Sequence, residues 1–256
     1  MSADIFSLQD RTALVTGASS GIGRVLAQGL AAAGARVAAV ARRAERLEDL
    51  VREIKGQGGT AIAVQADVTD RESIERAFDS AEHAFGIVDI VVSNAGVTDS
   101  RNFLKVDAAA RDTVMDTNFR GVWNVGQTAA RRMVNAGRGG SIINVASVLG
   151  LGVQSGLASY CASKGAVIQL TRSMAIDLMQ HGIRVNALAP GWFKTELNDA
   201  FFDSPVGQEK IARMPARRLG LIKELIGPVL LLASDAGSFI NGSVIVVDGA
   251  LDALVA

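Results

Sequence analysis

The sequence predicts an α/β fold, a Rossmann-like doubly wound parallel sheet of about seven strands with helices on both faces. Short apolar runs of strand length alternate along the chain with longer stretches whose apolar residues recur at helical spacing. No low-complexity linker and no internal repeat divides the 256 residues. Because an α/β chain of this length can fold as one unit, we expect residues 1–256 to form a single domain.

Composition and charge exclude several classes of protein. Lys plus Arg and Asp plus Glu each number 26, so the net charge is zero and no basic run suggests a nucleic-acid partner. No apolar run reaches the length of a membrane span, and residues 1–10 carry acids rather than the core of a signal peptide. Cys161 is the only cysteine, which excludes an intrachain disulfide and a cysteine metal cluster. We expect a cytoplasmic protein without a metal ion or a membrane partner.

Four strands alternate with three helices in the first part of the chain. Gly34 ends the first helix, and three glycines at 56, 58 and 59 end the second. The motif Thr69-Asp70-Arg71-Glu72 predicts a capping box at the start of the third helix. The expected strands are residues 12–15, 36–41, 61–65 and 88–93, and the expected helices run from the glycine-rich turn to 33, over 44–55, and from the capping box to about 85.

The second part of the chain continues the alternation. Asn118 and Asn124 lie inside a long predicted helix, where an asparagine is costly unless its side chain or backbone has a task. Residues 192–214 are mixed and rich in aromatic side chains, and we expect them to form a substrate-covering segment of short helices and loops. The expected strands are 141–146, 183–188 and 243–247, and the expected helices are 107–136, 160–179 and 223–234.

A glycine-rich stretch, Gly17-Ala18-Ser19-Ser20-Gly21-Ile22-Gly23, joins the first strand to the first helix. Glycines allow the backbone to approach a pyrophosphate, and a helix N-terminus offers free N–H groups and a positive dipole end. The same stretch also satisfies G-x-S-x-G, the nucleophile elbow of serine hydrolases, with Ser19 as the nucleophile. That alternative requires a catalytic histidine, for which His83 and His181 are the only candidates.

The end of the second strand indicates which dinucleotide is bound. An acid there normally accepts hydrogen bonds from the ribose hydroxyls of NAD, but this chain has Ala41. Arg42 follows with a planar, permanently charged group suited to a phosphate, and Arg43 adds a second charge. We therefore expect a preference for NADP(H), with NAD(H) possible.

Tyr160 and Lys164 lie four residues apart on a predicted helix and therefore share a face. A free phenol has a pKa of about 10, and one ammonium group about 4 Å away at an effective dielectric constant near 20 lowers it by roughly three units. Ser147 follows a buried strand, where open α/β sheets bind ligands. Together these side chains can hold a carbonyl oxygen and pass it a proton, although such pairs are also common on ordinary helices.

Taken together, these motifs resemble the short-chain dehydrogenase/reductase family, and in particular its ketoreductases. The resemblance covers the chain from about Asp10 to Gly249. It depends on the order and spacing of five features: the stretch from Thr16 to Gly23, Asp67, the sequence Asn94-Ala95-Gly96, the tetrad Asn118, Ser147, Tyr160 and Lys164, and Pro190-Gly191 with Thr195.

The resemblance implies hydride transfer between nicotinamide C4 and a carbonyl or alcohol carbon. Tyr160 would be the acid in reduction and the base in oxidation, and Ser147 would hold the substrate oxygen. Lys164 would lower the pKa of Tyr160 and bind the nicotinamide ribose, and Asn118 would anchor a water that links Lys164 to solvent. The implied cofactor-binding residues are Gly17, Ser19, Ser20, Gly21, Ile22, Gly23, Arg42, Asp67, Val68, Asn94, Ala95, Gly96, Tyr160, Lys164, Pro190, Gly191, Phe193 and Thr195.

The substrate is expected to be a small ketone or secondary alcohol. A mostly apolar pocket is expected around the reacting oxygen, lined by Ser147, Leu149, Val153, Gln154, Tyr160, Trp192, Phe201 and Phe202. A 3-oxoacyl thioester reductase and a sugar or polyol dehydrogenase are alternatives within the same family. A dinucleotide sensor without turnover is an alternative of another class, although it would not need a proton relay.

The C-terminal region suggests self-association. Residues 223–234 are strongly apolar, as is the tail over 250–256. Both can be buried in the subunit's own core, but an exposed apolar tail is a poor surface. The family resemblance implies a homotetramer assembled through this region.

Overall fold

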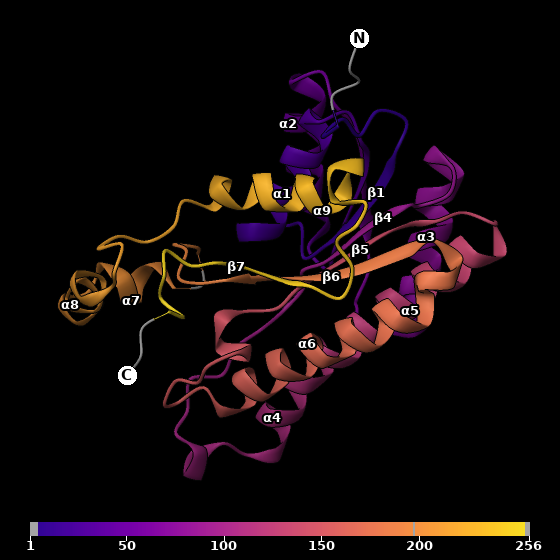
Figure 1. The fold of residues 1–256 in the computed structure, drawn as a ribbon. Coiled ribbons are helices and arrows are strands. Elements are labelled where there is room, and N and C mark those ends of the chain that lie inside the picture. Colours follow the sequence, from indigo (N-terminus) through magenta and orange to yellow (C-terminus); the bar gives the residue numbers. More distant parts are fainter. Residues whose placement is uncertain (1–4, 197, 254–256) are drawn as a thin grey trace.

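The computed structural model describes residues 5–196 and 198–253. Its centre is a seven-stranded sheet in the order β3-β2-β1-β4-β5-β6-β7, and every pair of neighbouring strands is parallel (Figure 1). The prediction of a doubly wound parallel sheet is confirmed. The strands are β1 Thr12–Thr16, β2 Arg36–Ala41, β3 Thr60–Gln65, β4 Ile90–Ser93, β5 Gly140–Val145, β6 Ile183–Pro190 and β7 Val244–Val247.

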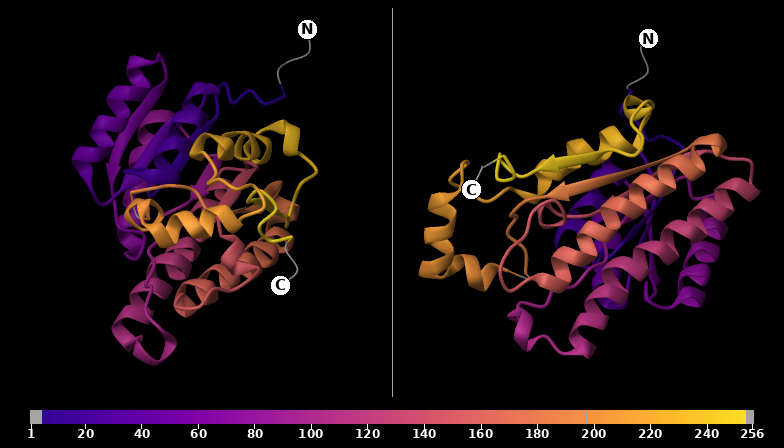
Figure 2. Two further views of the ribbon diagram at one scale, coloured as in Figure 1. Left: turned by 90° about the vertical axis from the view of Figure 1, so that its left-hand side faces the viewer. Right: turned by 60° about the horizontal axis from the view of Figure 1, so that its bottom comes forward.

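Helices cover both faces of the sheet (Figure 2). The helices of one face pack into a core with β1, β2 and β5, and those of the other face pack into a second core on the opposite side of the strands. β1 and β4 are buried along their whole length, which explains why they are continuous apolar runs rather than alternating patterns. The first face carries α1 Gly21–Ala32, α2 Ala44–Gly56 and α9 Ile226–Ala233, and the second carries α3 Arg71–Phe85, α5 Gly121–Asn135 and α6 Ala158–Leu178.

The strand order reverses between β1 and β4. The chain moves outward from β1 to β2 and β3 and then returns to pair β4 on the other side of β1. Consequently α1, which follows β1, and α5, which follows β4, cover opposite faces of the sheet, and the carboxyl ends of β1 and β4 open into a crevice. Open α/β sheets bind their ligands at such a switch point.

The long helix expected over 107–136 is interrupted. The structure has α4 Ala108–Met115, then a π-helical turn over Asp116–Arg120, and then α5. The third helix also begins differently from the prediction, because Asp70 is its N-cap and accepts a hydrogen bond from the N–H of Glu72. The Thr69 hydroxyl instead bonds Asp67 Oδ1, so the capping box is wrong.

Two short helices follow β6 within residues 192–214. They are α7 Asp199–Asp203 and α8 Pro205–Arg213, and Figure 1 shows them at one end of the molecule. The expectation of short helices and loops is confirmed for this segment, of which residue 197 lies outside the described part. Single turns of 3₁₀-helix occur at Phe103–Lys105, Val148–Gly150, Met179–His181, Ile222–Leu225 and Asp235–Gly237.

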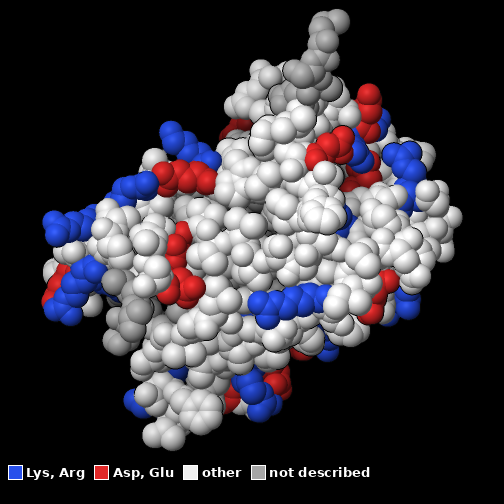
Figure 3. Space-filling view, viewed as in Figure 1, with Lys and Arg blue, Asp and Glu red and all other residues white. Residues whose placement is uncertain are grey.

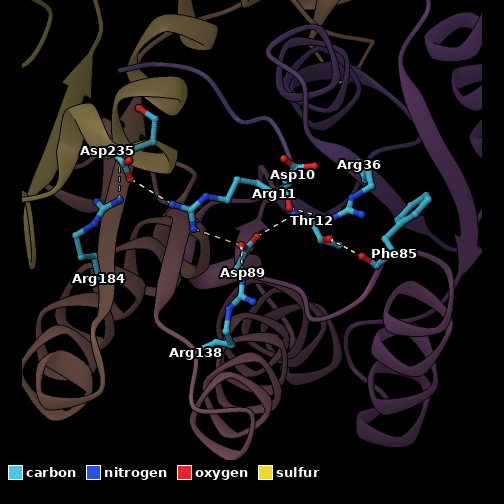
Figure 4. A network of polar contacts seen from close by, with 10 residues as sticks. Asp10, Arg11, Thr12, Arg36, Phe85, Asp89, Arg138, Arg184 and Asp235 are labelled. Atoms are coloured by element: carbon cyan, nitrogen blue, oxygen red, sulfur yellow. Dashed lines mark hydrogen bonds and ion pairs between the residues drawn. The ribbon is translucent and has the colours of Figure 1, made fainter. Parts of the chain in front are cut away.

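The amino-terminal edge of the sheet is closed by polar contacts (Figure 4). The buried Asp89 carboxylate accepts a hydrogen bond from the N–H of Thr12 at 2.9 Å and pairs with Arg11 at 3.3 Å and Arg138 at 3.7 Å. Arg11 also reaches Asp235 just beyond α9. The chain's own charges thus occupy this edge. No helix within the described ranges has the length and apolar character needed to cross a membrane.

Candidate active site

A cleft of about 720 Å³ lies at the carboxyl ends of the strands. The loops that follow β1, β2, β3, β4, β5 and β6 all contribute to its walls, and residues around 192–201 border it on the outer side. The fold therefore brings together segments that are up to 184 residues apart in the sequence, from Gly17 to Phe201, as the doubly wound topology requires.

The glycine-rich loop forms one wall of the cleft. The backbone of Gly17 has φ +67, and a Cβ there would lie 2.8 Å from Asn94 Nδ2. Ser20 is the N-cap residue of α1, but its side chain accepts no hydrogen bond from the N–H groups of the first turn. The first turn of α1 also contains no acid. The N-terminal N–H groups of α1 thus remain available for an anion.

Gly23 differs from the rest of this loop. It is buried and does not line the cleft, and its role in cofactor binding stays a prediction. A Cβ at Gly23 would lie 2.4 Å from Asn94 Nδ2 and 2.5 Å from the carbonyl oxygen of Gly17. Gly23 therefore allows the first turn of α1 to pack against the loop and β4. Ser19, Ser20, Gly21 and Ile22 do line the cleft.

Two arginines follow β2, and they point to different partners. Arg43 donates to Ser19 Oγ at 3.0 Å and to Ser20 Oγ at 2.7 Å, so its guanidinium lies on the glycine-rich loop. Arg42 is 73% exposed and its NH1 is 4.0 Å from Asp67 Oδ2. Both arginines and Ala41 line the cleft. An anion at the end of β2 would meet two cations and two hydroxyl groups.

Polar groups between β1, β3 and β4 shape the floor of the cleft. Thr16 Oγ1 accepts from the N–H groups of Asn94 at 3.0 Å and Ala95 at 3.2 Å. Asn94 Nδ2 donates to the carbonyl oxygen of Thr16, which ties the two loops together. Asp67 and Val68 line the cleft after β3, and Gly96 lines it after β4. Five residues predicted to bind the cofactor thus lie together here: Asp67, Val68, Asn94, Ala95 and Gly96.

Ser147, Tyr160 and Lys164 converge on the cleft from β5 and α6. Ser147 has an extended backbone just beyond β5, and its Oγ accepts from the N–H of Leu149 at 3.1 Å. Lys164 Nζ is 5.7 Å from the centroid of the Tyr160 ring and donates to the carbonyl oxygen of Val145 at 2.7 Å. The helical spacing therefore places the tyrosine and lysine side by side, as predicted.

Burial shifts the pKa values of both groups in the direction that favours the neutral form of each. Desolvation lowers the pKa of Lys164 from its usual 10.5 to about 8. Burial also raises the pKa of Tyr160, and the Ser147 hydroxyl offsets part of that rise. Desolvation thus dominates at Tyr160, and the lysine ammonium donates to the Val145 carbonyl. The role of Lys164 in lowering the pKa of Tyr160 stays a prediction.

Asn118 lies in the π-helical turn and is completely buried. Its Oδ1 accepts from the N–H of Val97 at 2.8 Å, and its Nδ2 donates to Val97 O at 2.9 Å and Ser163 Oγ at 3.0 Å. The side chain therefore fixes the loop after β4 to α6. A Cβ on Gly96 would be 3.2 Å from Asn118 Oδ1 and 3.7 Å from Lys164 Nζ, so the two polar groups flank the same point.

The outer end of the cleft contains the predicted substrate residues, with two exceptions. Leu149, Gln154, Trp192 and Phe201 line the cleft together with Ser147 and Tyr160, as do Pro190, Gly191, Phe193 and Thr195 on the β6 side. Phe202 is only 1% exposed and packs its ring against Trp192 and Phe201 instead. Val153 is 87% exposed and borders a separate shallow cavity. Neither residue lines the cleft, so the structure does not bring these two together with the other predicted substrate residues.

The hydrolase alternative fails on geometry. Ser19 follows the carboxyl end of β1, and its hydroxyl accepts hydrogen bonds from Arg43. His83 lies near the end of α3 and His181 just before β6, so both are at the amino-terminal edge of the sheet and both are exposed. A strand of about five residues, at roughly 3.3 Å per residue, separates them from Ser19. Neither histidine can act as its base.

Sequence reasoning overlooked Lys210 on α8. Its Nζ donates to Gln154 Oε1 at 2.6 Å and lies 4.2 Å from the centroid of the Trp192 ring. These partners are remote in sequence, so no local pattern signals the contact. In the part of the chain that the structure describes, no cluster of His, Cys, Asp and Glu has the arrangement of a metal site.

Comparison with known proteins agrees with this geometry. The family model for short chain dehydrogenase matches residues 11–205. A gluconate 5-dehydrogenase of Gluconobacter oxydans (strain 621H) is 40% identical over 249 residues, which cover 97% of each chain. A 3-oxoacyl-[acyl-carrier-protein] reductase of Staphylococcus aureus (strain Mu50) is 38% identical over 242 residues, covering 94% of this chain and 98% of the relative.

A solved structure is also similar over nearly the whole chain. It is a gluconate 5-dehydrogenase from Burkholderia cenocepacia J2315 in complex with NADP and tartrate. The TM-score is 0.94 at 39% identity, and the match covers 98% of this chain and 99% of the other.

Proposed function

The chain belongs to the short-chain dehydrogenase family and is an oxidoreductase, and on that premise we propose that it is an NADPH-dependent carbonyl reductase and secondary alcohol dehydrogenase. The observation that carries the proposal is the convergence of Ser147, Tyr160 and Lys164 on a cleft that also contains an uncapped helix N-terminus. The first set of groups suits proton transfer to a carbonyl oxygen, and the second suits a dinucleotide phosphate.

The cofactor-binding part of the proposal rests on the residues between β1 and β4. The N-terminus of α1 would hold the diphosphate, and Arg43 with Ser19 and Ser20 would hold a phosphate on the adenosine ribose. Arg42 would add its charge from the rim. A relative of similar structure contains NADP, which supports this choice over NAD. When bound, the nicotinamide ring supplies or accepts the hydride.

The proton part of the proposal rests on the buried phenol. Ser147 would bind the substrate oxygen, and Tyr160 would donate a proton to it in reduction. Because burial raises the pKa of Tyr160, the phenol is protonated at neutral pH, which is the form needed by a general acid. In oxidation the phenolate must form, and the nearby ammonium of Lys164 would stabilise its charge.

A proton must also reach Tyr160 after each turnover. Lys164 is buried, and its pKa of about 8 lies close to neutrality, so it can exchange a proton at physiological pH. Asn118 flanks the same point as the lysine ammonium and keeps this region polar. We propose that a water held between Lys164 and the π-helical turn of Asn118 completes the path to solvent.

Two substrate classes fit the proposed reaction. The similarity to gluconate 5-dehydrogenases favours a polyhydroxy acid or a polyol as the substrate of this chain. The similarity to a 3-oxoacyl-[acyl-carrier-protein] reductase favours an acyl thioester. The substrate end of this cleft combines apolar side chains such as Leu149 and Phe201 with the polar group of Gln154. We favour a small polar carbonyl compound because Gln154 adds a polar group to the apolar side chains at this end of the cleft.

We propose that residues 1–256 act as one domain in which residues 192–214 cover the substrate. This segment contributes Trp192, Phe193, Thr195 and Phe201 to the wall of the cleft. Its contacts with the rest of the chain include an exposed ion pair between Glu196 and Arg46. A surface contact of this kind can break and re-form, which suits a segment that opens and closes.

We also propose a homotetramer, because two separate apolar surfaces are left uncovered. β7 is an edge strand whose Val246 is 39% exposed, and Figure 3 shows few charged residues over the middle of the face that carries β7 and α9. Trp123 on α5, Ile176 on α6 and Met179 just after α6 are exposed on the other face. Two different self-complementary patches produce a tetramer with two-fold axes. A cytoplasmic location, where NADPH is available, completes the proposal.

The proposed function is tested by mixing the purified protein with NADPH and a panel of carbonyl compounds and following absorbance at 340 nm. Substrate-dependent loss of absorbance is expected for at least one polar ketone. Fluorescence binding of NADPH in the same preparation checks that the protein is folded. Binding without turnover of any carbonyl would contradict the proposal and favour a dinucleotide sensor.

A further inference from the structure

Lys210 is a half-buried lysine for which the described residues supply no carboxylate partner within 4.0 Å. Its ammonium donates to the neutral amide oxygen of Gln154 and lies 4.2 Å from the Trp192 ring centroid and 5.9 Å from that of Phe201. All three partners line the substrate end of the cleft. Partial desolvation without a counter-ion lowers the pKa of Lys210.

The neighbouring cations of the same segment are arranged differently. Lys194 pairs with Asp203, and Arg213 pairs with Glu209 one turn along α8. These charges are neutralised within the segment itself. Lys210 is therefore exceptional among the described cations of residues 192–214, because its ammonium contacts residues of the substrate end of the cleft and is left without an anion.

Gln154 adds a second donor at the same place. Its Oε1 is occupied by Lys210, which leaves its Nε2 hydrogens without a partner among the described residues. An ammonium and an amide NH₂ side by side are both donors, so they suit a ligand with two acceptor oxygens. A hydroxyl group of a neutral sugar can satisfy only part of this arrangement, whereas a carboxylate can accept from both.

We infer that Lys210, with Gln154, binds the carboxylate of an acidic substrate and makes the enzyme selective for hydroxy and oxo acids over their neutral analogues. The inference rests on the proposed oxidoreductase function of the same cleft. A carboxylate bound here is the counter-ion that Lys210 otherwise lacks, and it links α8 to the loop after β5. The reacting carbonyl is then left to Ser147 and Tyr160, deeper in the cleft.

The alternative explanation is that Lys210 only latches α8 to the loop that contains Gln154. The two explanations differ in their effect on substrates. A latch would change the kinetics of acidic and neutral substrates alike, because it acts on the segment as a whole. A carboxylate-binding residue changes the acidic substrate selectively and acts mainly through KM.

The test uses substrate pairs that differ only in a carboxylate. 5-Keto-D-gluconate and L-sorbose form such a pair for reduction by NADPH, and D-gluconate and D-sorbitol form the corresponding pair for oxidation. We measure the ratio of kcat/KM for the acid to that for the neutral compound. Lys210→Met, which retains the length of the side chain against Trp192, should lower this ratio by about ten- to a hundredfold, mostly through KM.

Two matched variants accompany the test. Lys194→Met removes a lysine of the same segment that is already paired, and it should leave the ratio as in wild type. Lys210→Arg keeps the charge and should restore a large part of the selectivity. A ratio within twofold of wild type in Lys210→Met, or a wild type that prefers the neutral member of each pair, would overturn the inference.

A measurement without turnover separates this inference from the proposed function. Titration of the protein with tartrate and with D-gluconate in the presence of NADPH, followed by tryptophan fluorescence, should show saturable binding in wild type and much weaker binding in Lys210→Met. Absence of carboxylate binding to wild type overturns the inference even where neutral ketones are reduced. Carboxylate binding without reduction of any carbonyl contradicts the proposed function alone.

Discussion

Burial acts on Tyr160 and Lys164 in opposite directions, raising the pKa of the phenol and lowering that of the ammonium. Both shifts favour the neutral forms, so the pair can hold and move a proton in an environment that penalises charge. The same burial makes Lys164 costly for folding. Its effect on stability therefore depends on pH in a way that can be measured.

We predict that wild type gains stability relative to Lys164→Met as the pH rises from about 8 to 10.5. In this window the unfolded state keeps the lysine proton and the native state has lost it, so the free energy of unfolding rises with pH. A shift of this size corresponds to at most about 3 kcal/mol. Urea unfolding of the cofactor-free protein at pH 7.5 and 10 measures it, and a pH-independent difference would show that Lys164 has an ordinary pKa.

Arg43 is the residue that the structure places best for a phosphate on the ribose, because its guanidinium lies on Ser19 and Ser20. We predict that Arg43→Ala lowers kcat/KM for NADPH by about ten- to a hundredfold and changes that for NADH little, since a charge-assisted bond contributes roughly 1.5–3 kcal/mol. Arg42→Ala should have a smaller effect, and Arg52→Ala on the outer side of α2 is the control. Equal losses with both cofactors would argue against phosphate recognition.

Individual site residues were predictable where a local rule fixes them. Tyr160 and Lys164 follow from helical spacing, and Ser147 follows from its position after a buried strand. The direction of a side chain in a loop follows no such rule. Val153 points outward and Phe202 is buried beneath Trp192 because packing between distant segments decides their orientation. Lys210 was unpredictable for the same reason.

At the scale of elements, the segment over residues 192–214 differs from the sheet and its covering helices. Glu196 pairs with Arg46 at the surface, and Lys210 bonds Gln154 near the cleft. Each of these two ties is a single side-chain contact, whereas Phe193, at 4% exposure, anchors the start of the segment in the core. The part that can move without disturbing the core is therefore α7 and α8. Elements of this kind open at low free-energy cost.

We predict that the amides of α7 and α8 exchange rapidly in the free protein and slow down by at least tenfold when NADPH and a substrate analogue are bound. The reason is that closure adds contacts on the cleft side of a segment that otherwise has few. Hydrogen exchange followed by mass spectrometry measures this, with peptides from β1 and β5 as the protected reference. Strong and equal protection of α7 and α8 in both states would exclude a mobile cover.

Most elements followed from the sequence because apolar periodicity distinguishes strands from helices. Two features did not. The π-helical turn at Asp116–Arg120 has no propensity signal, although the buried Asn118 inside an apolar pattern hinted at an irregularity.

The position of α9 departs from the rule that connections between parallel strands are right-handed. The chain crosses the sheet in the same direction from β5 to β6 and from β6 to β7, but α6 and α9 cover opposite faces, so these two connections have opposite hands.

At the scale of the whole molecule, α9 contributes Val229 and Leu232 to the subunit's own core, and Leu225 just before α9 is buried there as well. The apolar composition that suggested an interface is thus partly explained by internal packing. The edge strand β7 and the exposed residues of α5 and α6 remain as apolar surfaces. The described part of the tail ends at 253, so the expectation for 254–256 lies outside the described residues.

We predict a tetramer of about four times the 26.7 kDa chain mass, measured by light scattering at micromolar concentration. Val246→Lys should reduce it to a dimer by placing a charge on the edge strand, and Ile176→Lys should produce a dimer through the other surface. The two substitutions together should give a monomer. A wild-type monomer would contradict the assembly, whereas retention of the tetramer in both single variants would show that other surfaces form it.

The most direct test of the central claim compares wild type with Tyr160→Phe in the NADPH-dependent reduction of the best carbonyl substrate. The substitution removes the transferable proton and leaves the ring, so binding of NADPH should remain and kcat should fall by about 10²–10⁴-fold. Retention of more than about a tenth of the wild-type kcat, with cofactor binding intact, would show that Tyr160 is not the acid.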